Sequence, residues 1–298
     1  MNLNLSLVNS PRTDGARVLR AKAALRAELD EPRRQGRSIG LVPTMGYLHE
    51  GHLSLLRAAR AECDLVVMSL FVNPTQFGPG EDLERYPRDE ERDLRLASEA
   101  GVDLVYAPTV DEVYPDGFAT AVEVSGNLTA VLDGDPGRRG PEHFRGVATV
   151  VAKLFNSVGP DVAYFGQKDA QQAAVIRRLA RDLDFPLRIE VLPTVREPDG
   201  LAMSSRNAYL DADARRRAVA ISRALGVAER ATREGSLAAG LAAAREELAS
   251  AGIEPEYLEA RDAEELEPVA ALNGRPVLIV VAARVGGARL IDNVLIRP

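Results

Sequence analysis

The sequence predicts an α/β protein with a doubly wound parallel sheet and a smaller C-terminal α+β domain. Over the first two thirds of the chain, continuous apolar segments of strand length alternate with longer amphipathic segments. Strands of this kind are buried on both faces, and helices cover the parallel sheets that they form. Near residue 195 the alternation gives way to two long Ala- and Arg-rich segments, followed by short apolar runs. We therefore predict a Rossmann-like domain over residues 1–194 and an α+β domain over residues 195–298.

The same patterns define the expected elements. Strands of the larger domain are expected at residues 39–43, 65–72, 102–107, 120–124, 162–165 and 187–192. Its helices are expected at residues 15–34, 52–62, 88–100, 146–157 and 169–183. The smaller domain is expected to hold helices at 211–231 and 236–251 and strands at 254–260, 276–283 and 288–291. Gly286 and Gly287 predict a hairpin between the last two strands. The Gly-, Pro- and charge-rich stretch 133–142 predicts a mobile surface loop.

Charge and composition restrict the classes of function. The 298 residues carry a net charge of −7 with a pI near 5.3, which argues against a general nucleic-acid surface. No apolar run reaches the length of a membrane span, and residues 1–5 lack the pattern of a signal peptide. The single cysteine, Cys63, excludes an intrachain disulfide framework and suits a reducing compartment. We expect a cytoplasmic protein that binds neither membranes nor nucleic acid.

Two of the three histidines, His49 and His52, lie between an expected strand and an expected helix. Backbone N–H groups and the helix dipole favour an anion at such a helix N-terminus. Gly51 should cost about 1 kcal/mol relative to alanine within a helix, but it lets a ligand approach the backbone closely. The pattern favours phosphate binding.

Two other uses of this histidine pair remain open. A histidine at a strand–helix turn is often a helix cap or a half-buried polar residue. Histidines at i and i+3 also suit zinc, which needs further ligands, and only Cys63 and His143 remain besides carboxylates. No Cys-x-x-Cys or His-Glu-x-x-His pattern occurs.

Asn73 and Gln76 follow the strand expected at residues 65–72. Their amides offer uncharged donors and acceptors, which suit the hydroxyls or carboxylate of a small polar substrate. Asn73 is equally suited to cap the turn that Pro74 indicates. We favour substrate contact for Gln76 and leave both roles open for Asn73.

Lys168, Asp169 and Gln172 follow the strand expected at residues 162–165. A lysine at the start of a helix opposes the helix dipole, and a phosphate in the same space would offset this cost. Asp169 is suited to cap the helix or to bind a ribose hydroxyl. Because ligands of such sheets collect at the carboxyl ends of the strands, these groups are expected to converge with the histidines.

Ser204, Ser205 and Arg206 form a further group at the junction of the two expected domains. Two hydroxyls beside a guanidinium suit a polyphosphate, and the alternative is a serine cap for the following helix. The position of this group suggests that the smaller domain closes over a nucleotide. No Walker A, Gly-x-Gly-x-x-Gly or Gly-x-Ser-x-Gly pattern occurs. What remains is stabilisation of a transferring phosphoryl group by imidazoles, a lysine and an arginine.

With these motifs in place, the chain resembles the pantothenate synthetases (pantoate–β-alanine ligases), a family of the His-x-Gly-His nucleotidyltransferase superfamily. The similarity spans nearly the whole chain in the order of the family. It comprises Pro-Thr-Met-Gly-x-Leu-His-x-Gly-His at 43–52, Asn-Pro-x-Gln-Phe at 73–77, Tyr-Pro-Arg at 86–88, His-Phe-Arg-Gly-Val at 143–147, Phe-Gly-Gln-Lys-Asp-x-Gln-Gln at 165–172 and Met-Ser-Ser-Arg-Asn at 203–207.

The resemblance implies a two-step reaction. Pantoate and ATP give pantoyl adenylate and pyrophosphate, and β-alanine then displaces AMP to give pantothenate. A carboxylate is already ionised at neutral pH and attacks phosphorus without a general base. The resemblance implies catalytic roles for His49, His52, Lys168 and Arg206. It assigns the remaining ATP contacts to Met45, Gly51, Phe165, Gly166, Gln167, Asp169, Val195, Met203, Ser204 and Ser205, and the pantoate contacts to Met45, Asn73, Gln76 and Gln172.

The resemblance also implies Mg²⁺, for which Asp93 is the nominated acidic position, and a homodimer. The segment 133–142 is longer and more charged than the corresponding segment of the family, which bears on loop closure and rate. Two alternatives remain. A class I tRNA synthetase fragment or another adenylyltransferase also carries His-x-Gly-His, but a synthetase needs a tRNA-binding extension. A non-enzymatic regulator would bind ATP without releasing pyrophosphate.

Overall fold

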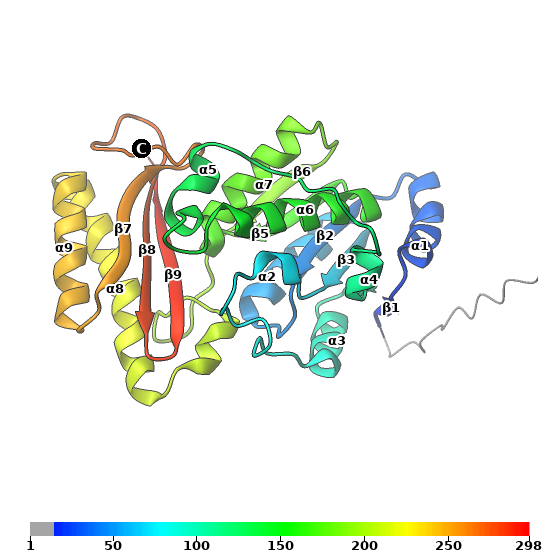
Figure 1. The fold of residues 1–298 in the computed structure, drawn as a ribbon, viewed down its shortest axis with the longest axis horizontal. Helices are drawn as coiled ribbons and strands as arrows, with labels where there is room; N and C mark the ends of the chain where they lie inside the picture. Colours follow the sequence, from blue (N-terminus) through cyan, green and yellow to red (C-terminus); the bar gives the residue numbers. More distant parts are fainter. Residues whose placement is uncertain (1–14, 298) are drawn as a thin grey trace, which may run out of the picture.

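The computed structural model describes residues 15–297, and its larger sheet has six parallel strands in the order β1-β4-β3-β2-β5-β6 (Figure 1). The strands are β1 (Arg17–Leu19), β2 (Ile39–Thr44), β3 (Leu65–Leu70), β4 (Leu104–Tyr106), β5 (Val162–Gly166) and β6 (Arg188–Leu192). The predicted doubly wound sheet is confirmed. Chain order reverses between the neighbours β2 and β5, so their carboxyl ends flank the topological switch point.

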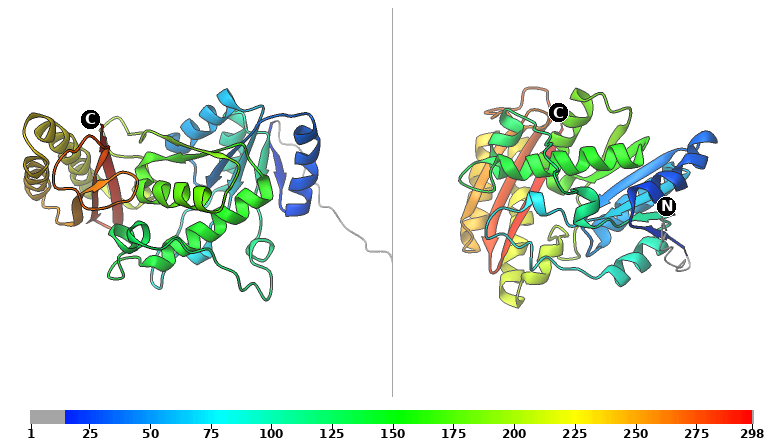
Figure 2. Two further views of the ribbon diagram at one scale, coloured as in Figure 1. Left: turned by 90° about the horizontal axis from the view of Figure 1, so that it is seen from above. Right: turned by 45° about the vertical axis from the view of Figure 1, so that its right-hand side comes forward.

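Helices cover both faces of this sheet, as Figure 2 shows from above for α2 and α6. The helices are α1 (Lys22–Arg34), α2 (Glu50–Glu62), α3 (Glu90–Glu99), α4 (Val110–Val113), α5 (Asn127–Ala130), α6 (Pro141–Val158) and α7 (Ala170–Asp182). Short 3-10 turns are η1 (Pro74–Gln76), η2 (Leu132–Gly134), η3 (Gln167–Asp169) and η4 (Ser205–Tyr209). Alternation along β2 explains the two layers, because Leu41 packs with α1, α6 and α7 while Val42 packs with α2 and α3.

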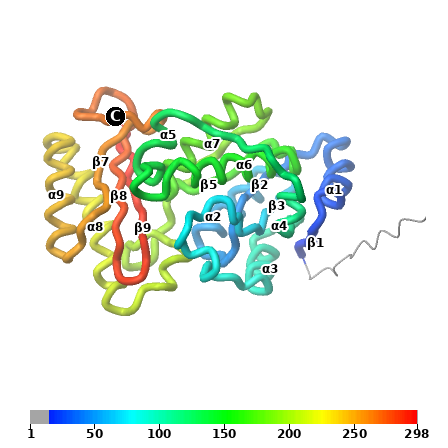
Figure 3. Tube along the Cα trace, viewed as in Figure 1, coloured from blue at the N-terminus to red at the C-terminus, as the bar shows by residue number. Residues whose placement is uncertain are grey.

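The C-terminal part consists of α8 (Ala212–Glu234), α9 (Leu237–Ser250) and an antiparallel sheet of β7 (Pro255–Asp262), β8 (Val277–Val285) and β9 (Ala288–Ile296). The predicted hairpin is confirmed, since Val285 pairs with Ala288 across the two glycines. Along β8, Ile279 and Val281 pack against α8 and α9, whereas Val280 and Ala282 join the core of the larger sheet. The small sheet therefore lies between its own helices and the first part of the chain (Figures 1 and 3). The exact boundary at residues 194 and 195 stays a prediction.

Two expected elements were wrong. Residues 120–124 form no strand, although Thr120 to Val124 alternate as a strand would. The backbone of Val122 instead bonds to the Thr149 hydroxyl of α6, and no neighbouring strand is there to pair with it. The helix expected at 15–34 begins only at Lys22, because residues 17–19 pair with β4 as an edge strand. Residues 17–19 become a strand only because they pair with β4, which is distant in sequence, and the local pattern of three residues does not predict such pairing.

The segment 133–142 also differs from the expected surface loop. Asp133 is buried, and its carboxylate accepts hydrogen bonds from Arg289 of β9 at 2.9 and 3.1 Å and from Tyr257 of β7 at 2.8 Å. The start of this segment therefore anchors the larger sheet to the small one. Residues 1–5, for which no signal peptide was expected, lie outside the described residues. Within residues 15–297, no helix combines the length and apolar character needed to cross a bilayer.

The contact between α6 and η1 predicts that Gly146→Ala destabilises the protein. A Cβ at Gly146 would lie 2.3 Å from the carbonyl oxygen of Thr75, and a backbone group cannot turn aside as a side chain does. We expect a loss of about 1–3 kcal/mol in the free energy of unfolding, the usual cost of overpacking, measured by urea denaturation.

The matched control is Gly226→Ala in α8, where the nearest atom to the new Cβ is Arg230 Nη1 at 3.6 Å. Alanine there should be neutral or stabilise the helix by about 0.5–1 kcal/mol. If Gly146→Ala and Gly226→Ala changed the free energy of unfolding equally relative to the wild type, the tight contact between α6 and η1 would be contradicted.

Candidate active site

One cleft of about 400 Å³ lies at the carboxyl edge of the parallel sheet and extends to the β8–β9 hairpin. It is lined by almost all of the residues singled out from the sequence: Met45, His49, Gly51, His52, Asn73, Gln76, Phe165, Gly166, Lys168, Asp169, Gln172, Val195, Met203, Ser204, Ser205 and Arg206. The expected convergence of the motifs is therefore confirmed. Gln167 and Asp93 are the exceptions, because their side chains bond to other parts of the fold.

The two histidines cap the N-terminus of α2 reciprocally. His49 Nδ1 accepts a hydrogen bond from the Gly51 N–H at 3.1 Å, and His52 Nδ1 accepts one from the His49 N–H at 3.3 Å. The ring centroids lie 4.1 Å apart. Because each Nδ1 accepts, the proton of each neutral ring is on Nε2. Both rings line the cleft, so both can offer an Nε2–H donor to an acceptor bound there.

Both imidazoles are neutral at pH 7. Burial, and then the charge of Lys168, lower the pKa of His49 to about 4. Burial and the neighbouring His49 hold the pKa of His52 well below its usual value. The capping role and the ligand-binding role, which the sequence offered as alternatives, are thus compatible, since they use different ring nitrogens.

Gly51 is required here by the His49 ring. A Cβ at Gly51 would lie 2.9 Å from the Cε1 and Nδ1 atoms of that ring. The sequence suggested that this glycine lets a ligand approach the backbone, and the group that approaches in this structure is the histidine itself.

Asp93 holds the loop that precedes α2. Its carboxylate accepts the backbone N–H groups of Tyr47 and Leu48, both at 2.7 Å, and Tyr47 has a positive φ of 52°. The carboxylate is buried, lies outside the cleft lining, and burial raises its pKa in spite of these bonds. The structure gives no support to the nomination of Asp93 as a magnesium ligand, because each of its oxygens already accepts a backbone hydrogen bond.

Lys168 and Asp169 belong to η3 at the end of β5. Lys168 Nζ lies 3.5 Å from Asp169 Oδ1, and the Asp169 side chain makes no hydrogen bond that caps α7. The structure thus gives no support to the capping alternative for Asp169. Gln167 was expected at the ATP site, but its side chain turns away to bond Asn293 of β9 at 3.1 Å. Asn293 also donates to the carbonyl oxygens of Gln167 and Lys168, at 2.9 and 3.0 Å.

Ser204, Ser205 and Arg206 line the same cleft as the histidines. Ser204 Oγ accepts the Arg206 N–H at 3.3 Å and so caps the 3-10 turn η4, whereas the following helix α8 is capped by Asp211 instead of a serine. Ser205 Oγ donates to the Tyr47 carbonyl at 3.4 Å, which joins this loop to the histidine loop. The backbone of Met203 bonds to the Val195 carbonyl at 3.0 Å.

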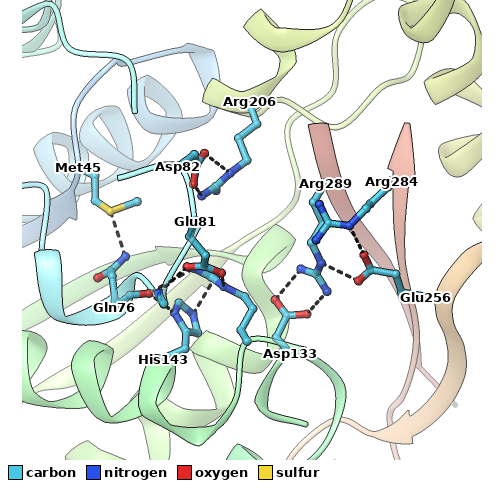
Figure 4. A network of polar contacts seen from close by, with 12 residues as sticks. Met45, Gln76, Glu81, Asp82, Asp133, His143, Arg206, Glu256, Arg284 and Arg289 are labelled. Carbon is cyan, nitrogen blue, oxygen red and sulfur yellow. Dashed lines mark hydrogen bonds and ion pairs between the residues drawn. The ribbon is translucent and has the colours of Figure 1, made fainter. Parts of the chain in front are cut away.

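The amide of Gln76 is oriented by its neighbours. Asn73 Nδ2 donates to Gln76 Oε1 at 3.2 Å and to the Gly146 carbonyl at 3.1 Å. Gln76 Nε2 therefore points toward Met45, whose sulfur lies 3.0 Å away at the cleft wall (Figure 4). Asn73 Oδ1 also accepts the Thr75 N–H at 3.3 Å, so the turn-capping role of Asn73 is confirmed.

His143, which the sequence left without a role, supports the same turn from α6. Its Nδ1 lies 2.7 Å from the Gln76 carbonyl and its Nε2 lies 3.0 Å from Arg139 Nη1. A carbonyl only accepts and a guanidinium only donates, so the ring proton is on Nδ1. Burial, and then the charge of Arg139, lower the pKa of His143 to about 4.

Sequence reasoning missed several residues of the site. Glu81 and Asp82 follow the motif at 73–77 and bind the side chains of Arg139 and Arg206. They looked like ordinary surface charges because their partners are distant in sequence. Asn293 carried a signal, since Asp292 and Asn293 interrupt an apolar run over residues 290–296. Within residues 15–297, no three His, Cys, Asp or Glu side chains gather as a metal site, so the zinc alternative gains no support.

Comparisons with known proteins agree with this architecture. The family model described as Pantoate-beta-alanine ligase matches residues 17–295. The pantothenate synthetase of Moorella thermoacetica is 55% identical over 282 residues, which cover 94% of this chain and 98% of the relative. The crystal structure of pantothenate synthetase from Thermus thermophilus superimposes with a TM-score of 0.88 at 50% identity, covering 95% of this chain and 100% of that one. The pantoate-beta-alanine ligase of Francisella tularensis, complexed with beta-gamma ATP and beta-alanine, has a TM-score of 0.76 at 32% identity, covering 93% and 97%.

The neutral state of the buried histidines predicts acid sensitivity. A histidine with a pKa of 6.5 when unfolded and about 4 in the fold binds more protons when unfolded throughout that interval. The contribution of the neutral histidine to the free energy of unfolding should therefore be fully present above pH 6.5 and fall as the pH drops toward 4. For His143 alone the loss is at most about 3 kcal/mol.

The measurement is urea denaturation between about pH 5 and 7, where most carboxylates stay ionised. His143→Gln keeps an amide donor for the Gln76 carbonyl but does not titrate, so its stability should depend less steeply on pH than that of the wild type. Identical slopes would mean that His143 does not contribute.

Proposed function

Because this chain belongs to the pantoate–β-alanine ligase family, we propose that the cleft is where its reaction takes place. The chain is a ligase that condenses pantoate with β-alanine to pantothenate at the expense of ATP. The observation that carries the assignment is the pair of neutral, mutually capped histidines at the switch point. They line one cleft together with Lys168 and Arg206, and the same cleft carries the amides of Gln76 and Gln172 beside apolar side chains.

We assign the triphosphate to His49, His52, Lys168 and Arg206, assisted by the hydroxyls of Ser204 and Ser205. Neutral Nε2–H groups donate to phosphate oxygens, while the two cations offset the charge. The ribose is assigned to Gly51, Phe165 and Asp169, and the adenine to the backbone around Gly166, Val195 and Met203. The Francisella relative, which is complexed with beta-gamma ATP and beta-alanine, supports this use of the fold.

We assign pantoate to one part of this cleft, called the pantoate pocket below. Met45, Gln76 and Gln172 line it together with apolar side chains of α6, among them Val147 and Val150. Pantoate combines hydroxyls and a carboxylate with two methyl groups, which suits amides beside an apolar wall. Asn73 keeps its assignment to this pocket, and its bonds to Gln76 Oε1 and Gly146 support a role in aiming the Gln76 amide.

The chemistry proceeds in two displacements. A carboxylate oxygen of pantoate attacks the α-phosphorus, the bond to the bridging oxygen breaks, and pyrophosphate leaves. The β-alanine amine then attacks the acyl carbon of pantoyl adenylate, the acyl–oxygen bond breaks, and AMP leaves with the amide formed. Lys168, Arg206 and the histidine donors stabilise the charge that gathers on the phosphate oxygens.

No histidine serves as the base for the β-alanine ammonium. In each of the three rings the unprotonated nitrogen already accepts a hydrogen bond: His49 from Gly51, His52 from the His49 N–H, and His143 from Arg139. We propose that the proton passes to water or to a departing phosphate oxygen.

Magnesium is implied by ATP chemistry in this family. Mg²⁺ usually keeps several waters and is bound by substrate phosphates with one or two carboxylates. The cleft fits an ion that enters with the triphosphate, because the described residues gather no carboxylate cluster of their own. We assign no protein ligand to it, and its contribution would be to neutralise phosphate charge.

Three broader features are also proposed. The C-terminal part, from residue 195, closes over the nucleotide, which the position of the loop carrying Arg206 supports. The protein is a homodimer, as the family resemblance implies. It acts in the cytoplasm, in keeping with a single cysteine that is buried.

Exchange of pyrophosphate into ATP with pantoate present and β-alanine absent tests the first displacement. We expect His49→Ala and Lys168→Ala to lower this exchange by about 100-fold or more each, because each removes a donor to the developing phosphate charge. Circular dichroism should show a folded protein. Exchange near that of the wild type in either variant would overturn the phosphate assignment, and no exchange by the wild type would overturn the adenylate route.

For Gln76→Ala we expect a pantoate KM that rises about tenfold or more, with an ATP KM within about twofold of the wild type, since the lost amide serves only the pantoate pocket. Gln171→Ala is the informative comparison on α7. Gln171 lines the same cleft, but its amide is already engaged by the carbonyl oxygens of Leu128 and Val131 and by the Asp133 N–H. Gln171→Ala should lower the free energy of unfolding instead of raising the pantoate KM selectively. An unchanged pantoate KM in Gln76→Ala would mean that pantoate does not bind beside Gln76.

A further inference from the structure

The loop between η1 and α3 carries two adjacent carboxylates that bind arginines from opposite walls of the cleft (Figure 4). Asp82 pairs with Arg206 from the loop that follows residue 195. Glu81 pairs with Arg139 from the segment that precedes α6. Both pairs are largely shielded from solvent, with side-chain exposures of 15% for Asp82 and 25% for Glu81.

Asp82 holds Arg206 in one orientation. Arg206 Nε donates to Oδ2 at 3.0 Å and Nη2 donates to Oδ1 at 2.9 Å, which is the two-point geometry that fixes the plane of a guanidinium. Among the described residues, no group accepts a hydrogen bond from Nη1 in this arrangement. The guanidinium carbon also lies 5.8 Å from the centre of the Tyr86 ring, which further restricts the side chain.

The electrostatics favour a permanent ion pair. Although burial raises it, the hydrogen bonds and charge of Arg206 hold the pKa of Asp82 below its ordinary value. The pair is therefore charged at neutral pH. An arginine fixed in this way loses less conformational entropy when it binds a phosphate than one that swings freely.

Glu81 acts on the other wall. Arg139 donates to its two carboxylate oxygens at 2.8 and 3.0 Å, and the same guanidinium donates to His143 and to the Gln76 carbonyl. This chain of contacts ends at the turn that carries Gln76. The two neighbouring carboxylates thus support different ends of the cleft.

We propose that Asp82 is a positioning residue for the reaction: its carboxylate orients Arg206 so that the Nη1 group of that side chain is presented to the triphosphate of ATP. The inference rests on the proposed function, because it takes Arg206 as a phosphate ligand. Glu81 serves the pantoate end through Arg139, and its substitution is the matched control.

The test compares Asp82→Asn, Glu81→Gln, Arg206→Ala and the double variant Asp82→Asn/Arg206→Ala by steady-state kinetics. Asp82→Asn should raise the ATP KM about tenfold and leave the pantoate KM within about twofold, whereas Glu81→Gln should show the reverse selectivity. In the Arg206→Ala background, Asp82→Asn should change the ATP kinetics by less than about twofold, because its effect passes through the missing guanidinium. Asp82→Glu, which keeps the charge, should recover most of the ATP affinity.

Thermal unfolding of each variant separates folding from function, and titration calorimetry with ATP alone measures binding without turnover. Should Asp82→Asn fail to fold, Asp82→Ser carries the test, since its shorter side chain also removes the two-point contact with Arg206. An ATP affinity that is unchanged or tighter in folded Asp82→Asn or Asp82→Ser, with Arg206→Ala impaired, overturns the positioning role alone. Unimpaired ATP kinetics in Arg206→Ala overturn the phosphate assignment itself.

Discussion

The reciprocal capping of α2 by His49 and His52 is the interaction on which the site depends. Two ring nitrogens satisfy backbone N–H groups that would otherwise lack partners at the helix N-terminus. The same bonds place the ring protons on Nε2 and so leave donors at the cleft. Gly51 is needed because a Cβ would strike the His49 ring, and Asp93 is needed because it holds the loop that leads into the helix.

Neutral imidazoles suit this position. A charged histidine at a helix N-terminus would oppose the dipole and repel Lys168, so burial and these charges together keep the rings uncharged. Positive charge is supplied instead by side chains that enter from other elements, namely Lys168 after β5 and Arg206 after the domain junction. In this site the histidines donate hydrogen bonds, whereas Lys168 and Arg206 compensate charge. Each task depends on a different set of contacts.

Distant segments keep these groups in place. Asn293 of β9 bonds the backbone that carries Lys168, and Asp133 joins the segment before α6 to Arg289. The C-terminal sheet therefore supports the site with polar contacts as well as with the apolar face of β8. Asp82 and Glu81 also connect distant segments at the cleft, because Asp82 binds Arg206 and Glu81 binds Arg139.

The sequence by itself determined five of the six strands of the larger sheet, the five longer helices that cover it and the chemistry-bearing motifs, because apolar periodicity and local turn residues are properties of contiguous segments. It also placed His49, Gln76 and Lys168 in one cleft, since the carboxyl ends of parallel strands share an edge. Only the tertiary structure decided the pairings between segments. It showed that residues 120–124 have no strand to join, that Asp93 serves a backbone loop, and that Gln167 faces Asn293. It also joined Asp82 to Arg206 across more than a hundred residues, because such a contact depends on how the whole chain folds and on nothing in either local pattern.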